Sequence, residues 1–507
     1  MVLKRHFICV LGTSPYTDCV YEIEGTEFAY KTPFVQMAVL KYIMPETQPE
    51  DQITVLLTEK AYAANWVDRE YSERELENLR NQNMILKPGQ KRAGLERHLA
   101  EAFPDIAVET VMIPEGCNKK ELNKIFEAIY NNLGSDEIVY FDFTHGLRNI
   151  PMQALAVIHY AKALKNIKVG GLYYGAFELG KQGDDGIRHV NVLDMSFSSE
   201  ILDWTNAAQA FVKGGSSNQI KELYTDYVDK DEKKKIGSIV NSLYDLTNCL
   251  NTSRGKATGT AKNSIQKAYM DFKRKFDEMQ ERSHEISEEE LMRLFERIGK
   301  DVAKFNRKLY AAKEDGYVCL ENTSIGMAAV EWDIEKNLTQ QGFTALEETV
   351  KTYLCEMYGM KAEKQRDREL VNDPLKFAGK KYNDERHQNK KSGSAESFNI
   401  EKYRDEYYKE LSNSEKLKKL SEDEKNFYSE KLVNILVHLP EKLIRMSVNV
   451  TDMRNTINHF GFQENASSYE KLQRRLEELY VDLQNVMEES DVVSMDGSEQ
   501  QNAIPER

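Results

Sequence analysis

The chain has 507 residues, with 69 basic and 83 acidic side chains and a formal net charge of −14. This length predicts about three domains, and this charge excludes a protein whose whole surface is a polycation for nucleic acid, although it leaves room for a local basic groove. Glycine and proline are few for the length, at 27 and 11, which favours long helices over many short strands.

The first 200 residues alternate short apolar runs with helical patterns. The expected strands are Phe7–Leu11, Ile53–Leu57, Ile106–Ile113, Ile138–Phe143, Val169–Tyr174 and His189–Leu193. The expected helices are Phe34–Ile43, Glu73–Leu79, Lys119–Asn132 and Pro151–Leu164. Apolar strands that alternate with helices indicate a parallel sheet covered on both faces. This part of the chain is therefore predicted to be a Rossmann-like α/β domain.

The strand signal ends at about Ser199, and the rest of the chain has helical patterns. Residues 365–397 are polar and lack an apolar period, which predicts a mobile loop. The acidic tail from Ser490 is predicted to be disordered. The expected fold class is thus α/β followed by an all-α part.

The cysteines and the apolar runs indicate the compartment. None of the six cysteines forms a C-x-x-C pair, so we expect no zinc finger or thioredoxin-type site, and their sparseness is typical of a reducing compartment. No apolar run has the length of a membrane span, and the first residues lead directly into a strand and not into a signal-peptide core. We expect a cytoplasmic protein without membrane contact.

Two of the expected strands end in polar residues. Gly12, Thr13 and Ser14 follow the first strand, and Thr144, His145, Gly146, Arg148 and Asn149 follow the fourth, just before a helix that Pro151 can open. Ligands of open α/β sheets bind beyond the carboxyl ends of the strands, and a helix N-terminus favours anions. An ordinary turn at Gly12, with Asp142 as a cap and Arg148 as a surface charge, is the alternative. The absence of G-x-G-x-x-G leaves a nicotinamide site with little support.

The run Y-F-D-F-T-H-G-L-R-N-I-P, with the turn L-G-T-S and the strand G-L-Y-Y-G, resembles the CARF domain of CRISPR-associated type III accessory proteins over about residues 5–198. The resemblance implies a dimer that binds a cyclic oligoadenylate across its two-fold axis, with cyclic tetra-adenylate favoured over hexa-adenylate. By the same resemblance the ligand site would contain Gly12, Thr13, Ser14, Thr144, His145, Gly146, Arg148 and Asn149, with Thr58 as a weaker addition.

A second motif, R-N-x-x-x-H, stands near the C-terminus at Arg454, Asn455 and His459. On an ideal helix, five residues turn the chain by about 500°, which leaves Arg454 and His459 roughly 140° apart. The two side chains of one helix are therefore poorly placed to bind the same substrate, unless the helix is distorted or a second copy of the motif faces it. The alternative is a helix end at which His459 interacts with the last carbonyls and Arg454 is solvated.

This motif resembles that of HEPN ribonucleases, which occur together with CARF domains on one chain. The resemblance implies a helical HEPN nuclease domain at 336–507, leaving 1–198 as the ligand-sensing domain and 199–335 as a helical connector. Arg454 would stabilise charge on the phosphorane, His459 would transfer protons, and Asn455 would orient the histidine or the phosphate. Because the 2′-hydroxyl of RNA is the nucleophile, no metal or other cofactor is required, and the products would carry a 2′,3′-cyclic phosphate.

The sequence thus predicts a cyclic oligoadenylate-activated, metal-independent endoribonuclease that cuts single-stranded RNA in type III CRISPR antiviral defence, as a homodimer or higher oligomer. Two alternatives stay open. One is a ligand-responsive regulator without catalysis that binds DNA or a protein partner through its helical part. The other is a ring nuclease, in which the α/β domain degrades its own ligand. The sequence contains no Walker motif and no dinucleotide-binding motif, which disfavours a nucleotide-dependent metabolic enzyme.

Overall fold

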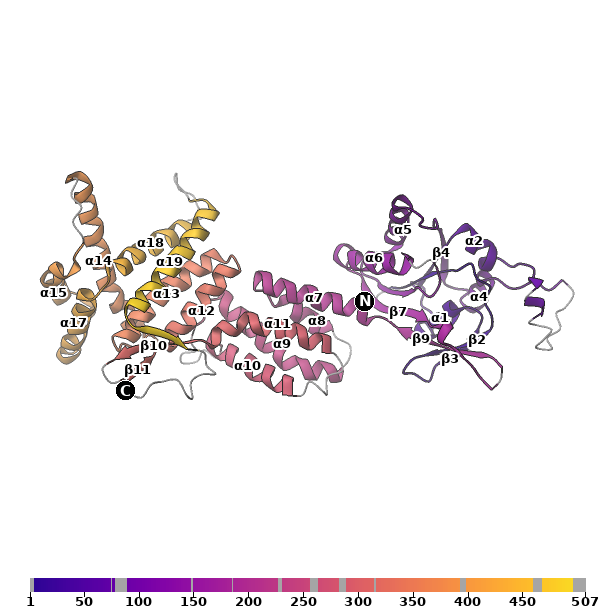
Figure 1. The fold of residues 1–507 in the computed structure, drawn as a ribbon, viewed down its shortest axis with the longest axis horizontal. Coiled ribbons are helices and arrows are strands. Elements are labelled where there is room, and N and C mark those ends of the chain that lie inside the picture. The colour runs from indigo at the N-terminus through magenta and orange to yellow at the C-terminus, as the bar shows by residue number, and fades with distance from the viewer. Residues whose placement is uncertain are drawn as a thin grey trace. The chain divides into compact units, whose positions relative to one another are not determined.

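A computed structural model gives the structure of the chain and describes residues 4–73, 75–77, 89–146, 149–184, 186–226, 230–255, 263–281, 289–313, 316–392, 398–458 and 467–495. The chain divides into two compact units, Met1–Asp203 and Trp204–Arg507. In Figure 1 the first unit runs from indigo to magenta and the second continues to yellow. The first unit carries the large sheet, and the second consists mainly of helices.

The N-terminal unit is built on a sheet whose centre is five parallel strands. These strands are β1 (Arg5–Val10), β4 (Gln52–Leu57), β5 (Ala107–Met112), β6 (Ile138–Asp142) and β7 (Lys168–Gly175). Their order is β5-β4-β1-β6-β7, so that β1 lies between β4 and β6. The predicted strands are present with ends shifted by one or two residues, and the α/β fold class of this part is confirmed.

Burial on both faces explains why β1 and β4 are continuous apolar runs, whereas β5, at the edge of the sheet, has no buried residue. Along β1, Phe7 and Cys9 belong to the hydrophobic core on one face of the sheet, while Ile8 and Val10 belong to the core on the other. Two helices pack on the first face, α1 (Val35–Ile43) and α4 (Leu95–Ala102). Two others pack on the second face, α5 (Lys119–Asn132) and α6 (Asn149–Lys165). The predicted helix Glu73–Leu79 lies partly outside the described residues.

The sheet continues beyond β7 through strands of which only one was predicted. They are β9 (Arg188–Asp194), β2 (Cys19–Ile23), β3 (Ala29–Thr32) and the short β8 (Lys181–Gln182). β9 runs antiparallel to β7 and parallel to β2, and β3 forms the edge. β2 and β3 were not predicted because they are short. β2 is only alternately buried and β3 buries only Thr32, so their sequences lack the continuous apolar run of β1 and β4.

A buried polar network joins three strands at the amino-terminal end of the sheet. His6 Nδ1 lies 3.0 Å from Glu137 Oε1, and His6 Nε2 lies 2.8 Å from Thr54 Oγ1. The Gly134 N–H donates to the same carboxylate at 2.7 Å. Burial acts to raise the pKa of Glu137, but the hydrogen bond and charge of His6 together with the Gly134 N–H outweigh it, and the pKa is lowered from its ordinary value of 4.5.

The lowered pKa of Glu137 predicts a loss of stability in acid. Because the folded pKa lies below 4.5, the unfolded chain binds more protons in this window, so the stabilisation is complete above about pH 5 and disappears as the pH falls through the folded pKa. Glu137→Gln should cost on the order of 1 to 3 kcal/mol at pH 7 and much less in acid. Hydrogen–deuterium exchange of peptides covering β1 and β6 measures this local stability. Equal protection of wild type and variant at neutral pH would contradict the prediction.

The second unit contains two helical cores. The first is formed by α7 (Phe197–Gly214), α8 (Asn218–Asp226), α9 (Lys230–Asn251), α10 (Ile265–Glu281) and α11 (Glu289–Val302). The second core involves α13 (Thr339–Met357), α14 (Gln365–Ser392), α15 (Arg404–Ser412), α16 (Glu415–Lys418), α17 (Glu422–Val437), α18 (Glu441–Asn458) and α19 (Tyr469–Glu489). α12 (Glu321–Glu335) belongs to both, since Trp332 packs in the first core and Val330 in the second. The predicted boundary at 335/336 thus falls at the end of a shared helix.

The predictions for the second unit need two corrections. Residues 365–392 are not a loop but the helix α14, which buries Leu370, Val371, Leu375 and Ala378. Pro374 and the many charged residues concealed this narrow apolar stripe from the sequence analysis. Residues 393–397 lie outside the described part.

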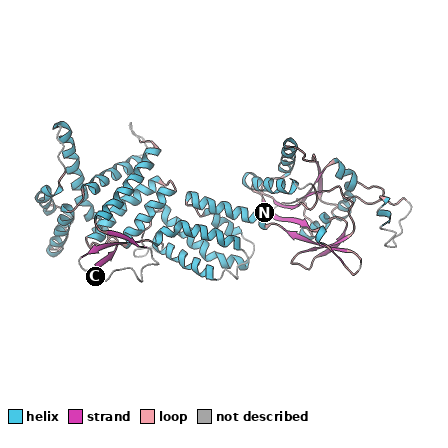
Figure 2. Ribbon diagram, in the orientation of Figure 1, coloured by secondary structure: helices cyan, strands magenta, loops and turns pink. Residues whose placement is uncertain are grey.

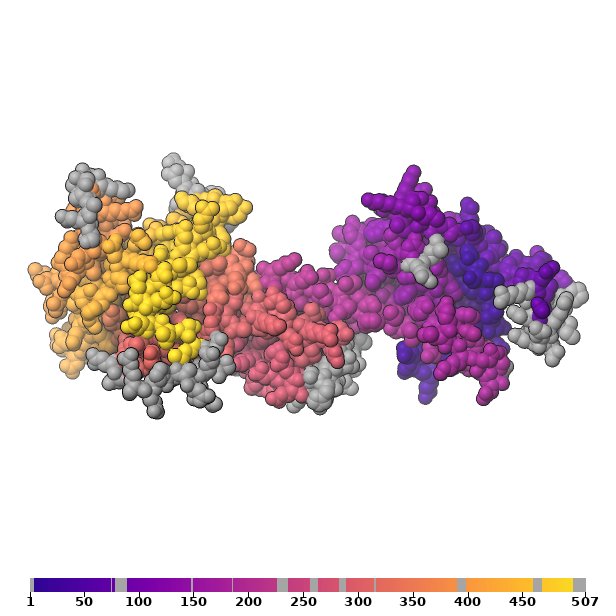
Figure 3. Space-filling view, viewed as in Figure 1, coloured from indigo at the N-terminus to yellow at the C-terminus, as the bar shows by residue number. Residues whose placement is uncertain are grey.

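The second correction concerns strands in the part predicted to be all-α. β10 (Lys308–Lys313), β11 (Gly316–Cys319) and β12 (Val492–Met495) form a three-stranded antiparallel sheet, visible in Figure 2. β12 belongs to the tail that was predicted to be disordered. Pairing across about 180 residues cannot be read from so short a strand. The space-filling view in Figure 3 shows the yellow residues of α19 beside the earlier helices of this unit, which agrees with its packing on α12 and α13.

Candidate functional site

The order of the parallel strands reverses at the carboxyl ends of β1 and β6. Among the five central strands, β4 and β5 lie on one side of β1 and β6 and β7 on the other, while β2 and β3, which lie between β1 and β4 in the sequence, pair at the far end of the sheet. Such a switch point is where open α/β sheets bind ligands. The turn Gly12–Ser14 follows β1 here, and the segment Thr144–Gly146 follows β6. The structure therefore brings the two polar segments of the sequence analysis together.

Gly12 lies directly against His145. A Cβ at position 12 would stand 3.1 Å from His145 Cβ and 2.9 Å from Tyr16 Oη, so the turn leaves no room for a side chain there. The Gly12 N–H donates to Tyr16 Oη at 2.7 Å. Thr13 and Ser14, which follow, are exposed. The close approach accounts for glycine at this position.

Thr144 joins β6 to β7. Its hydroxyl accepts a hydrogen bond from the Gly175 N–H at 2.7 Å and donates to Asp142 Oδ1. The Thr144 N–H donates to the same carboxyl oxygen at 3.0 Å. Gly146 follows with a φ of +115°, which favours glycine, and a Cβ there would lie 2.9 Å from Val10 Cγ1. These contacts fix the path of the backbone between β6 and α6.

His145 is held in an apolar setting beside Tyr16, with the two ring centroids 4.4 Å apart. Its burial lowers its pKa to about 4, and its Nε2 is buried without a hydrogen-bond partner. The side chain is therefore a neutral imidazole at physiological pH. It can offer a ligand a single hydrogen bond, but not a positive charge.

Two other predicted ligand residues, Asn149 and Thr58, are engaged in hydrogen bonds within the protein. Asn149, in the first turn of α6, donates to the Gly116 carbonyl oxygen at 3.1 Å, which ties α6 to the segment after β5. Thr58 caps the short helix α2 (Glu59–Ala61), since its hydroxyl accepts a hydrogen bond from the Ala61 N–H at 3.2 Å. Arg148 lies outside the described residues.

Asp142, the last residue of β6, predicts a pH dependence of stability. Burial raises the pKa of this carboxyl to about 6, against an ordinary 3.8, and its Oδ2 has no hydrogen-bond partner. The folded chain therefore binds more protons between these values, and stability falls as the pH rises through this window. Asp142→Asn keeps an oxygen for Thr144 and should stabilise the protein on the order of 2 kcal/mol at pH 8, with little effect near pH 4.

Differential scanning calorimetry of both proteins at pH 4, 6 and 8 tests this prediction. The difference in the midpoint of unfolding should grow with pH. A variant that is less stable than wild type at every pH would show that the carboxylate itself holds the turn.

The buried residues that hold the turn after β1 in place were not predicted from the sequence. Asn65 lies in the π-helical turn η1 (Tyr62–Trp66) and is buried, and its Nδ2 donates to the carbonyl oxygens of Gly12 and Ser14 at 2.8 and 2.9 Å. Arg92 donates to the Tyr16 carbonyl oxygen and pairs with Glu75. No local pattern marks such residues, because the carbonyl groups of Gly12, Ser14 and Tyr16 to which they donate lie more than 50 positions away in the chain.

The second motif lies on α18. Arg454 Nη1 donates to Glu347 Oε2 on α13 at 2.8 Å, and 35% of its side chain is exposed. Burial acts to raise the pKa of Glu347, but Lys351 and Arg454 outweigh it, and the pKa is lowered. Asn455 is exposed on the same helix, and His459 lies outside the described residues. One nitrogen of Arg454 is thus held by a carboxylate, while part of its guanidinium remains accessible.

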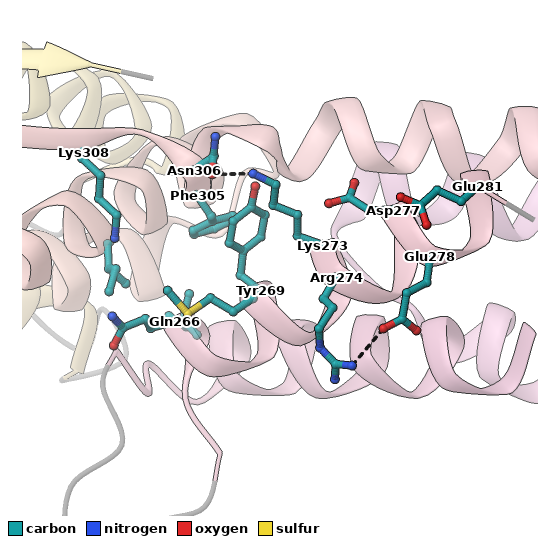
Figure 4. A pocket seen from close by; sticks show the side chains of 13 residues that line it. Gln266, Tyr269, Lys273, Arg274, Asp277, Glu278, Glu281, Phe305, Asn306 and Lys308 are labelled. Atoms are coloured by element: carbon teal, nitrogen blue, oxygen red, sulfur yellow. Dashed lines mark hydrogen bonds and ion pairs between the residues drawn. The ribbon is translucent and has the colours of Figure 1, made fainter. Parts of the chain in front are cut away.

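A hollow of about 400 Å³ lies elsewhere in the second unit, along α10 and the 3-10 turn η4 (Ala303–Asn306). Figure 4 shows Lys273 reaching Asn306, at 3.1 Å, and Arg274 paired with Glu278, at 3.0 Å. Its charged lining residues are largely neutralised by one another, and none of the residues predicted from the sequence contributes to it. In the described part of the chain, no three His, Cys, Asp or Glu side chains converge as a metal site requires.

Comparison with known proteins shows a family match for the N-terminal unit. Residues 7–178 match the family described as "CRISPR system endoribonuclease Csx1, CARF domain". A curated relative, CRISPR-associated protein MJ1674 of Methanocaldococcus jannaschii, is 28% identical over 131 residues. This alignment covers 25% of the chain, and the chain spans only a fifth of the relative's length. In the described residues, no helix has the length and apolar character needed to cross a membrane.

Proposed function

The N-terminal unit matches the CARF domain of CRISPR-associated proteins over residues 7–178, and from this premise we propose that the chain is an endoribonuclease switched on by cyclic oligoadenylate. The CARF domain indicates a sensor in type III defence. The activity, the ring size and the dimer are our proposals, with cyclic tetra-adenylate as the favoured activator. RNA as the substrate implies action in the cytoplasm.

The observation that carries the sensor is the convergence of two polar turns at the switch point of the sheet. The turn Gly12–Ser14 and the segment Thr144–Gly146 follow β1 and β6, which are neighbours. The first offers exposed hydroxyls and backbone N–H groups, and the second leads into the N-terminus of α6. Phosphates and riboses need such groups. In a homodimer, two copies of this surface would present a symmetric floor to a symmetric ring.

The proposed cleavage uses the nucleophile that RNA itself carries. Attack of the 2′-hydroxyl on the adjacent phosphorus forms the new P–O bond and displaces the 5′-oxygen, leaving a 2′,3′-cyclic phosphate and a 5′-hydroxyl. Arg454 would stabilise the charge on the phosphorane oxygens with its accessible N–H groups. His459 would transfer the proton between the two oxygens, and Asn455 would orient it or the phosphate.

Arg454 is well placed for that role because its position does not depend on the substrate. The pair with Glu347 joins α18 to α13, and the adjacent Met453 and Ile457 pack on the helical core. A guanidinium held in this way loses less conformational freedom when it binds a phosphate. The second motif of a homodimer would complete the site, since residues five apart on a helix do not share a face.

A fluorophore–quencher single-stranded RNA tests the proposal. Full-length protein is incubated with it in EDTA, alone and with cyclic tetra- or hexa-adenylate, beside His459→Ala and an all-deoxy version of the substrate. We expect that the RNA substrate is cleaved and the all-deoxy substrate is not, and only in the presence of one of the two rings. We expect no cleavage by the His459→Ala variant. Ring binding without cleavage would overturn the ribonuclease and favour the non-catalytic regulator. Loss of the ring over time in the His459→Ala protein would reveal a ring nuclease.

A further inference from the structure

We propose that Asn65 is a positioning residue that turns the Thr13 N–H toward the activator, so that this backbone group binds a phosphate oxygen. The inference rests on the proposed sensor function and extends it to a residue that would not touch the ligand. It starts from the two hydrogen bonds of the buried Asn65 amide to the turn Gly12–Ser14.

The identity of the donor follows from its partners. Both acceptors are backbone carbonyl oxygens, those of Gly12 and Ser14, so the atom that faces them must be the NH₂ of Asn65. Its Oδ1 is buried with no hydrogen-bond partner, and 2% of the residue is exposed. Every hydrogen bond that this side chain makes within the described residues therefore goes to the turn. A residue needed only for packing would not leave a buried oxygen unpaired, because this costs stability.

The direction of the Thr13 N–H follows from the geometry of the peptide bond. The peptides described in this chain are trans, so the N–H of Thr13 points opposite to the carbonyl of Gly12. With that carbonyl directed at Asn65, the N–H is directed away from the protein interior. The next carbonyl, of Ser14, is also held by Asn65, and Pro15 after it carries no N–H.

The outer side of the turn is open. Among the described residues, the N–H groups of Thr13 and Ser14 donate to no other group, and both residues are exposed. An exposed turn with two N–H groups that donate to no protein group can bind an anion. The ligand class that fits is a phosphodiester, which is what a cyclic oligoadenylate presents.

The π-helical turn explains how Asn65 reaches two carbonyls. Residues Tyr62–Trp66 form a single wide turn after α2, and such turns are frequent at functional sites. Arg69 closes it from outside by donating to the Ala64 carbonyl oxygen at 2.8 Å. Arg69 thus stabilises the backbone next to Asn65, and Asn65 in turn stabilises the turn after β1.

Asn65→Asp tests the inference, because it keeps the shape of the side chain and replaces the donor by an acceptor. Isothermal calorimetry with the two rings should show affinity reduced on the order of ten- to a hundredfold, the value of one hydrogen bond to a charged group. Asn131→Asp is the matched control, since Asn131 is exposed near the end of α5, which leads into the opposite end of β6. Unchanged affinity in Asn65→Asp would overturn the inference.

A second measurement separates positioning from a merely structural role. In wild-type protein labelled with ¹⁵N-threonine, the Thr13 amide signal should move downfield when a ring binds, and at saturation it should not move in Asn65→Asp or in Asn65→Ala. A weakened variant in which Thr13 still shifts as in wild type would overturn the inference, as would a wild-type Thr13 that does not respond. The wild-type experiment can overturn the inference even where a variant fails to fold.

Failure of the proposed function is distinguishable from failure of this inference. If wild-type protein binds neither ring, the proposed sensor is wrong, and inorganic phosphate replaces the ring as the probe. A chemical-shift change of the Thr13 amide signal on addition of phosphate would then support the proposed anion site, and the absence of a change would refute it.

Discussion

Arg454→Ala should reduce activator-dependent RNA cleavage by about three orders of magnitude. A cationic donor that stabilises charge only in the transition state contributes about 10²- to 10³-fold or more to the rate, and loss of the guanidinium also leaves Glu347 without one of its two partners. Single-turnover cleavage of the fluorogenic RNA, with saturating ring, measures this rate constant. Arg454→Lys keeps the charge without the planar guanidinium, so its cleavage rate constant should lie between those of wild type and Arg454→Ala.

Arg445→Ala provides the matched control for this prediction. Arg445 lies on the same helix, α18, and is exposed, so its replacement is the same chemical change two and a half turns earlier. The control should cut RNA at the wild-type rate, and both variants should bind the ring as tightly as wild type. Cleavage by Arg454→Ala at more than a tenth of the wild-type rate would assign the catalysis to other residues.

Gly12→Val should raise the ring concentration needed for half-maximal activation by about a hundredfold. A Cβ at this position would lie 2.9 Å from Tyr16 Oη, closer than real Cβ atoms approach, and 3.1 Å from His145 Cβ, which is also tight. The two further methyl groups of valine must displace His145 or the turn itself, which changes the proposed phosphate site. Overpacking of this kind typically costs 1 to 3 kcal/mol. The experiment is a titration of ring against cleavage rate.

The form of the Gly12→Val titration matters as much as its midpoint. Because the substitution affects the sensor and not the proposed catalytic residues, the maximal rate at saturating ring should be preserved. Gly214→Val is the control, since a Cβ at Gly214 meets no atom within 4 Å. A Gly12→Val protein that binds the ring normally but no longer cuts RNA would contradict the assignment of this turn to the ligand.

The local sequence was sufficient for the elements that are buried on both faces. Phe7–Leu11 could be recognised as a strand because alternate side chains enter two different cores, which demands apolar residues at every position. The polar residues that follow could be recognised as a candidate site because the carboxyl ends of parallel strands share one edge. The same reasoning failed for α14, where Pro374 and many charged residues obscured the buried apolar positions, and for the strand Val492–Met495, whose partner is β10.

By itself, then, the sequence determined the parallel strands, the polar turns at Gly12 and Thr144, and the motif at Arg454, because each is encoded in residues that are neighbours along the chain. Only the tertiary structure decided which distant groups act on them. Asn65 is 53 residues from Gly12, and Glu347 is 107 residues from Arg454. A side chain can reach either partner only after the sheet and the helices have packed, and a hydrogen bond between such residues leaves no periodic pattern in the sequence.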